Sequence, residues 1–120
     1  MKVAFTATGN DLDAPLDNRF GRAAKFLIVE TENEEVTVLD NEMNLSAAQG
    51  AGIQAAQNVI KSGATCLVCD FVGPKAHRVL SEGRVKMYTS KAKTVREALT
   101  LLLDDKLEEV LSANAQEHWT

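Results

Sequence analysis

The sequence predicts a single α/β domain with a mixed five-stranded sheet in three layers, and three observations point to this fold class. The first half of the chain holds short apolar segments typical of strands. The second half alternates such segments with amphipathic stretches, which is the order of βα units whose strands pair in parallel. The length of 120 residues fits one hydrophobic core. We therefore expect one domain over residues 1–112 and a frayed polar tail over 113–120.

Five segments have the composition of strands. They are residues 2–8, 26–30, 35–39, 65–70 and 85–88. Four polar residues separate the second segment from the third, so these two are expected to form a hairpin with a short loop. Between the first two segments, residues 9–22 are polar and turn-rich. A connection of this length without regular structure usually has a function.

Two helices are expected in the middle of the chain. A capping box at residues 46–49 begins the first, and apolar residues then recur at helical spacing until Gly63. Gly73 and Pro74 open the second, because proline is tolerated in the first turn of a helix. Gly83 is expected to end it.

The third helix begins at a second capping box, residues 94–97, and carries a leucine-rich apolar stripe. Leu107, Val110 and Leu111 follow at a spacing that continues the helical pattern. We expect a further helical turn or two through these residues.

Composition excludes several classes of function. Apolar residues make up 45% of the chain and charged residues 25%, which is ordinary globular usage. The net charge of -4 argues against a nucleic-acid backbone as the main partner. No segment is long and apolar enough to span a bilayer, and the N-terminus lacks the apolar run of a signal peptide. We expect a cytoplasmic protein that contacts neither nucleic acid nor membrane.

Cys66 and Cys69 form a Cys-x-x-Cys pair, a spacing used by redox and metal sites. The pair lies in a predicted strand, where residues three apart point to opposite faces. Redox pairs instead use a helix N-terminus, which lowers the thiol pKa. We therefore interpret both cysteines as small buried hydrophobic residues, with Cys69 the less inert of the two because it is nearer the C-terminal end of the strand.

The carboxyl ends of the parallel strands are the expected ligand site, as in other open α/β sheets. Three segments should meet there: the loop after the first strand, residues 50–52, and residues 71–74. Helix N-termini offer free backbone N–H groups and partial positive charge, so this rim suits an anionic ligand. Gly50 and Gly52 would let a ligand approach the backbone, or would serve only close helix–sheet packing, and the sequence leaves both alternatives open.

Three ionisable side chains near this rim are candidates for chemistry. Arg22 follows Phe20 and Gly21, and its planar guanidinium suits an oxyanion, although a surface ion pair is an equal alternative. His77, on the second helix, could bind a metal, or could act with Asp70 as an acid–base pair in an enzyme acting on small anions. The plainer interpretation of both is a surface histidine and a turn carboxylate.

Several segments in order resemble one known family. They are Leu12–Leu16, Arg19–Ala23, Phe26–Val29, Gly50–Ala56, Gly73–Ala76, Val85–Tyr88 and Thr94–Ala98. Over residues 1–104 the chain is similar to the nitrogenase iron-molybdenum cofactor biosynthesis proteins, the small NifX- and NafY-core-like domains. The resemblance implies a ribonuclease H-like fold. It also implies binding or carriage of an iron–sulfur or iron–molybdenum cluster precursor without catalysis, and a protein partner that assembles or receives the metallocofactor.

The rim and the resemblance together give the expected site residues. The cofactor-binding set is Phe20, Gly21, Arg22, Gly50, Gly52, Asp70, Phe71, Gly73 and Pro74, with Cys69 and His77 as the available metal ligands. The sequence departs from the family at three positions: Gln49 stands where many members have histidine, Phe71 where histidine or asparagine is frequent, and Asp70 where glycine is common. A module that has lost its cluster ligands and binds another protein, anchored by Phe71, is therefore the alternative function.

Overall fold

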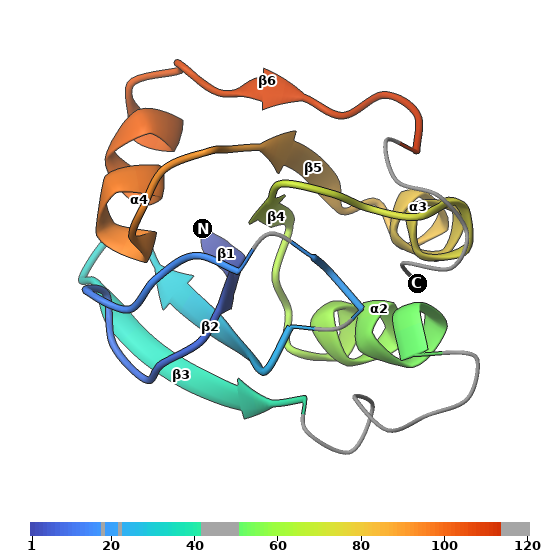
Figure 1. The fold of residues 1–120 in the computed structure, drawn as a ribbon, viewed down its shortest axis with the longest axis horizontal. Helices are drawn as coiled ribbons and strands as arrows, with labels where there is room; N and C mark the ends of the chain where they lie inside the picture. The colour runs from blue at the N-terminus through green and yellow to red at the C-terminus, as the bar shows by residue number, and fades with distance from the viewer. Residues whose placement is uncertain (18, 22, 42–50, 114–120) are drawn as a thin grey trace.

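The structure is a computed structural model that describes residues 1–17, 19–21, 23–41 and 51–113. These residues form a six-stranded mixed sheet in the order β3-β2-β1-β4-β5-β6 and three helices (Figure 1). The strands are β1 (Lys2–Ala7), β2 (Lys25–Glu30), β3 (Glu35–Asp40), β4 (Cys66–Cys69), β5 (Lys86–Thr89) and β6 (Glu108–Glu109). The helices are α2 (Ala51–Lys61), α3 (Pro74–Glu82) and α4 (Val95–Leu103).

Parallel strands occupy the middle of the sheet. β4 pairs in parallel with β1 on one side and with β5 on the other. β2 and β3 form the expected antiparallel hairpin beside β1, and β6 adds an antiparallel strand to β5. Three of the strands therefore place their carboxyl ends at one edge of the sheet.

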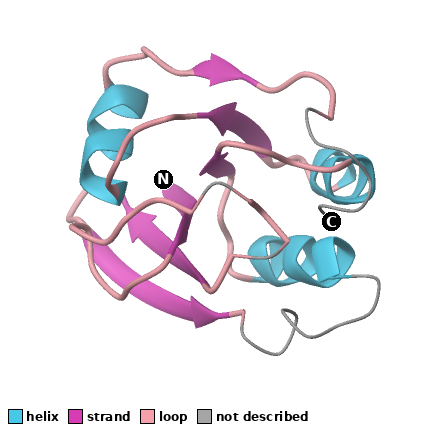
Figure 2. Ribbon diagram, viewed as in Figure 1, coloured by secondary structure: helices cyan, strands magenta, loops and turns pink. Residues whose placement is uncertain are grey.

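Helices cover both faces of the sheet (Figure 2). One buried cluster joins α2 and α3 to a sheet face that includes Leu67 and Cys69. A second cluster joins α4 to the opposite face, which includes Cys66 and Val68. The alternation expected for the two cysteines is thus confirmed, because each thiol belongs to a different core.

Gly83 and Arg84 occupy successive positions at the end of α3 and have different roles there. Gly83 has an ordinary φ of -80°, but a Cβ there would lie 2.5 Å from Cδ1 of Ile60 on α2. The glycine therefore permits close packing of the two helices. Arg84 takes the left-handed conformation that closes the helix, with φ of 62°, and Val85 N–H donates to the Leu80 carbonyl at 2.9 Å.

The expected extension of α4 through residues 107–111 is wrong, and the sheet has six strands rather than five. The helix ends at Leu103, and Asp105 has a φ of 57° that turns the chain. Val110 N–H then donates to the Met87 carbonyl at 2.7 Å, so this segment lies along β5 as an edge strand. The open edge of β5 needs backbone partners, and that requirement overrides the local helical spacing.

Two expectations fall outside the described residues: the first capping box, residues 46–49, and residues 114–120 of the polar tail. No helix among the described residues has the length and apolarity to cross a membrane.

Candidate functional site

The loop after β1 and the end of β4 meet, as the sequence predicts. Phe20 N–H donates to the carbonyl of Phe71 at 3.2 Å, and Arg19 forms a parallel bridge with Phe71. The ring of Phe20 is 1% exposed and packs on Phe26 with ring centroids 5.2 Å apart. Phe20 therefore anchors this segment in the core, and neither its buried ring nor its bonded N–H is presented to a ligand at the rim.

Asn41 holds the same loop from the other side. Its side chain is 1% exposed, and Nδ2 donates to the carbonyls of Gly21 and Ala23 at 3.2 and 2.7 Å. The sequence analysis did not single out this residue. The only local signal is a polar side chain directly after an apolar strand, which is also typical of a turn.

The first part of the long loop is fixed to α4. Leu16 N–H donates to the Lys93 carbonyl at 3.1 Å, and Arg96 N–H donates to the Leu12 carbonyl at 2.7 Å. The Arg96 guanidinium also pairs with Asp13 at 2.9 Å and with Glu34 at 3.6 Å. The loop is thus hydrogen-bonded along both its backbone and its side chains.

The chain leaves β4 and β5 toward opposite faces of the sheet. β4 leads to α3 in the first core and β5 leads to α4 in the second. Between the two strand ends, Thr89 Oγ1 donates to Asp70, at 3.1 Å to its carbonyl and 3.3 Å to its carboxylate. In α/β proteins, ligands bind where the chain changes direction in this way, so Thr89 is a further candidate site residue, one that the sequence analysis did not single out.

The glycines at the helix starts are placed as follows. Gly73 is buried, has extended backbone at the N-cap of α3, and has no side chain to accept a capping bond. Pro74 occupies the first turn of α3, as expected. Gly52 is buried in the first turn of α2, which packs against α3 (Figure 1). Gly50 and Arg22 lie outside the described residues.

Cys69 and His77 face different surroundings. The Cys69 thiol is 0% exposed, its Sγ lies 3.8 Å from the Phe71 carbonyl, and burial raises its pKa, with Asp70 contributing in the same direction. The His77 ring lies 3.4 Å from the Val110 carbonyl through Nε2 and 3.4 Å from Ser81 Oγ through Nδ1. Within the described ranges, no three histidine, cysteine or acidic side chains group as metal ligands.

Asp70 and His77 likewise have separate neighbours. The Asp70 carboxylate is bonded to Thr89 on β5, whereas the His77 ring is directed at the strand segment after β6.

These features define a small mixed α/β domain whose loop, strand end and helix start converge at the carboxyl edge of the sheet. The chain belongs to the dinitrogenase iron-molybdenum cofactor family, whose model matches residues 1–105.

Three similar proteins cover nearly the whole chain. An uncharacterized protein of Methanocaldococcus jannaschii is 30% identical over 111 residues, 90% of each chain. The apo form of the orange protein from Desulfovibrio gigas superposes with a TM-score of 0.92 at 37% identity, covering 95% of this chain and 96% of that one. A candidate NifB protein from Thermotoga superposes with a TM-score of 0.81 at 31% identity, covering 95% and 98%.

Proposed function

We propose that this domain binds and carries an anionic metal–sulfur cluster, or its precursor, during metallocofactor assembly, and that it does not itself catalyse a reaction. Family membership gives the class of cofactor, since the matched family is that of the iron-molybdenum cofactor of dinitrogenase. The observation that carries the proposal is the junction of Phe20 and Phe71, which brings the loop after β1 to the end of β4. The resulting edge adjoins the N-terminus of α3.

The chemistry of this edge favours an anion held without direct metal ligands. The start of α3 has a positive partial charge, and no side chain of the N-cap residue Gly73 occupies the free N–H groups of the first turn. Cys69, the nearest thiol, is buried and protonated, so it is a poor metal ligand in this conformation. We infer that the cluster brings its own sulfide ligands and is held by main-chain donors and by cationic side chains such as Arg22.

The proposal also includes a cellular location and a protein partner. A carrier must deliver its cargo, so we infer a metalloprotein or assembly protein as the recipient and a cytoplasmic location. We also assign the three-layer arrangement to the ribonuclease H-like motif, on the basis of the mixed sheet with helices on both faces.

Anaerobic reconstitution tests the proposed carrier role. The purified protein is mixed with ferrous iron and sulfide, with and without molybdate, and separated by gel filtration while visible absorbance is followed. We expect a chromophore that co-elutes with the protein and that is reduced in Arg22→Ala but retained in Arg78→Ala, a change of another arginine on the exposed side of α3. Absence of any protein-bound iron or chromophore in the unmodified protein would contradict the proposal.

A protein-binding module without cluster is the alternative, and the position of Phe71 favours it. The Phe71 residue is half-buried at the rim, where its ring can contribute to an interface. Partner binding measured with and without cluster reconstitution distinguishes the two functions. An interaction module binds its partner equally well with and without reconstitution and loses binding in Phe71→Ala, whereas a carrier needs the cluster.

A further inference from the structure

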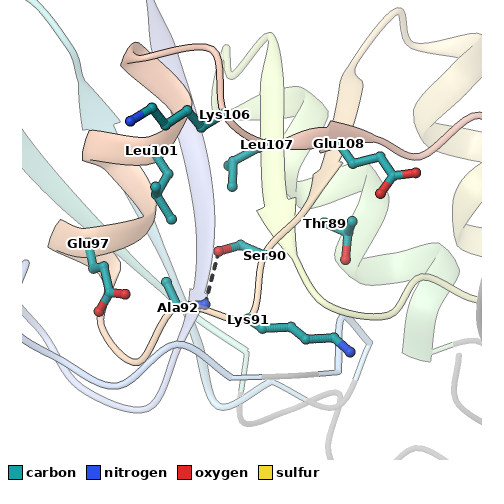
Figure 3. Close-up of a pocket in the computed structure, with 9 residues that line it drawn as sticks. All are labelled: Thr89, Ser90, Lys91, Ala92, Glu97, Leu101, Lys106, Leu107 and Glu108. Atoms are coloured by element: carbon teal, nitrogen blue, oxygen red, sulfur yellow. Dashed lines mark hydrogen bonds between the residues drawn. The ribbon is translucent and has the colours of Figure 1, made fainter.

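A pocket of about 430 Å³ lies on the α4 side of the molecule, and Thr89 is the one residue it shares with the rim described above. It is an open depression bordered by the end of β5, α4 and the connection from α4 to β6 (Figure 3). Ala92, Leu101 and Leu107, all half-buried, form its apolar part. The volume is in the range of small-molecule sites.

Charged side chains of both signs surround these apolar residues. They are Lys91, Glu97, Lys106 and Glu108, and all four are exposed (Figure 3). Within the described part of the chain none of them is recorded in an ion pair, so their charges remain available. Two cations and two anions cancel, and a polyanion or a polycation would meet repulsion as well as attraction. The pocket therefore suits a ligand that carries both charges itself.

A buried hydroxyl adds a directional contact. Ser90 is 4% exposed, and its Oγ accepts a hydrogen bond from Ala92 N–H at 3.1 Å (Figure 3). A hydroxyl that accepts one bond still has its own proton to donate. Ser90 lines the pocket, so its hydroxyl can donate to a ligand carboxylate there. The Lys91 side chain extends away from this hydroxyl (Figure 3) and reaches the same carboxylate only by turning toward it.

We propose that this pocket binds a small zwitterion with an apolar body, the chemistry of a free aliphatic α-amino acid. The ligand carboxylate accepts hydrogen bonds from the Ser90 hydroxyl and the Lys91 ammonium group. The ligand ammonium group faces the Glu97 carboxylate, and the aliphatic side chain packs on Leu101 and Leu107. This site shares Thr89 with the crevice at the rim but none of the residues proposed to hold the cluster, and binding there involves no covalent step.

The test is an NMR titration of the complete ¹⁵N-labelled protein with L-leucine. We expect saturable shifts of amides in the segments 89–92 and 106–108. N-acetyl-L-leucine lacks the ammonium charge and L-leucinamide lacks the carboxylate, so each should bind at least about threefold more weakly, as expected for loss of one exposed ion pair. Glycine, which lacks the apolar side chain, should also bind more weakly.

Matched variants locate the site. Lys91→Ala and Glu97→Gln should each weaken binding of L-leucine by about threefold or more, whereas Lys61→Ala on α2 and Glu82→Gln on α3 should not change it. All four side chains are exposed, so the variants should keep the dispersed spectrum of the folded protein. The proposal is overturned if L-leucine gives no saturable shifts at tens of millimolar, if the shifts lie elsewhere, or if the Lys91 and Glu97 variants bind as the unmodified protein does. Cluster reconstitution at the rim is measured separately and is unaffected by any of these outcomes.

Discussion

Replacing Phe20 should measure how strongly the loop after β1 is anchored. The ring is 1% exposed, and complete burial of a phenylalanine removes about 150–250 Å² from water, worth about 4–6 kcal/mol as an upper bound. Phe20→Ala should therefore cost about 3–5 kcal/mol, a large share of the stability of an ordinary domain. Phe20→Leu keeps most of the apolar volume, and we expect it to lower the free energy of unfolding by about 1–2 kcal/mol in urea denaturation.

A double-mutant cycle isolates the contact between Phe20 and Phe26. The centroids lie 5.2 Å apart with an interplanar angle of 48°, a tilted geometry worth about 0.5–1.5 kcal/mol beyond burial. Phe20→Leu and Phe26→Leu should couple by that amount. Phe5→Leu is the control, since Phe5 belongs to the core on the other face of the sheet and should add to Phe20→Leu within about 0.5 kcal/mol. Additive effects of Phe20→Leu and Phe26→Leu would refute the stabilising role of the ring pair.

Three further predictions concern the thiols, the end of α3 and the N-terminus. Burial raises the pKa of both Cys66 and Cys69, so neither thiol should react with a disulfide reagent at pH 8 until the protein unfolds, and prompt labelling of Cys69 in the native protein would show that the core opens there. Arg84→Gly relieves a left-handed conformation at a non-glycine residue and should raise the free energy of unfolding by about 0.5–1 kcal/mol, which urea denaturation would detect; an unchanged or lower value would contradict this account. The N-terminal ammonium group of Met1 lies 2.7 Å from the Glu30 carboxylate, and their hydrogen bond lowers the pKa of Glu30 and raises that of the amino group. The stabilisation from this pair is present between the ordinary pKa values of 4.5 and 8.0 and is lost as pH falls through the lowered pKa of Glu30 or rises through the raised pKa of the amino group. In Glu30→Gln, stability should depend less on pH at both ends of this range, and the same pH profile as the unmodified protein would rule out a contribution from the pair.

Much of the fold could be predicted because local patterns and tertiary structure agree. The hairpin of β2 and β3 follows from two apolar segments with a short polar loop, and the opposite faces of Cys66 and Cys69 follow from strand geometry. β6 could not be predicted in this way. Glu108 and Glu109 have no apolar alternation, and they form a strand only because β5 presents an unpaired edge.

The candidate site was predicted only in part, because some of its contacts depend, like β6, on the tertiary structure and not on local sequence. The meeting of the Phe20 and Phe71 segments follows from a general rule about the carboxyl ends of parallel strands, and it is confirmed. The contribution of Thr89 depends on which face the chain takes after β5, and that of Asn41 depends on where the loop folds back. Neither is encoded in a short stretch of sequence, because both arise from contacts between segments distant along the chain.

The hydrogen bonds between residues 12–16 and the start of α4 affect how far the carboxyl edge of the sheet is ordered before a ligand binds. Surface connections of this length usually sample many shapes and acquire one only when something binds. Here the Leu12 carbonyl accepts from Arg96 in the first turn of α4 and Leu16 N–H donates to Lys93 just before that helix, so this part of the connection takes its shape when the domain folds. Amide hydrogens of this stretch should then exchange with solvent at rates close to those of α4, and the edge can receive its ligand with little ordering left to do.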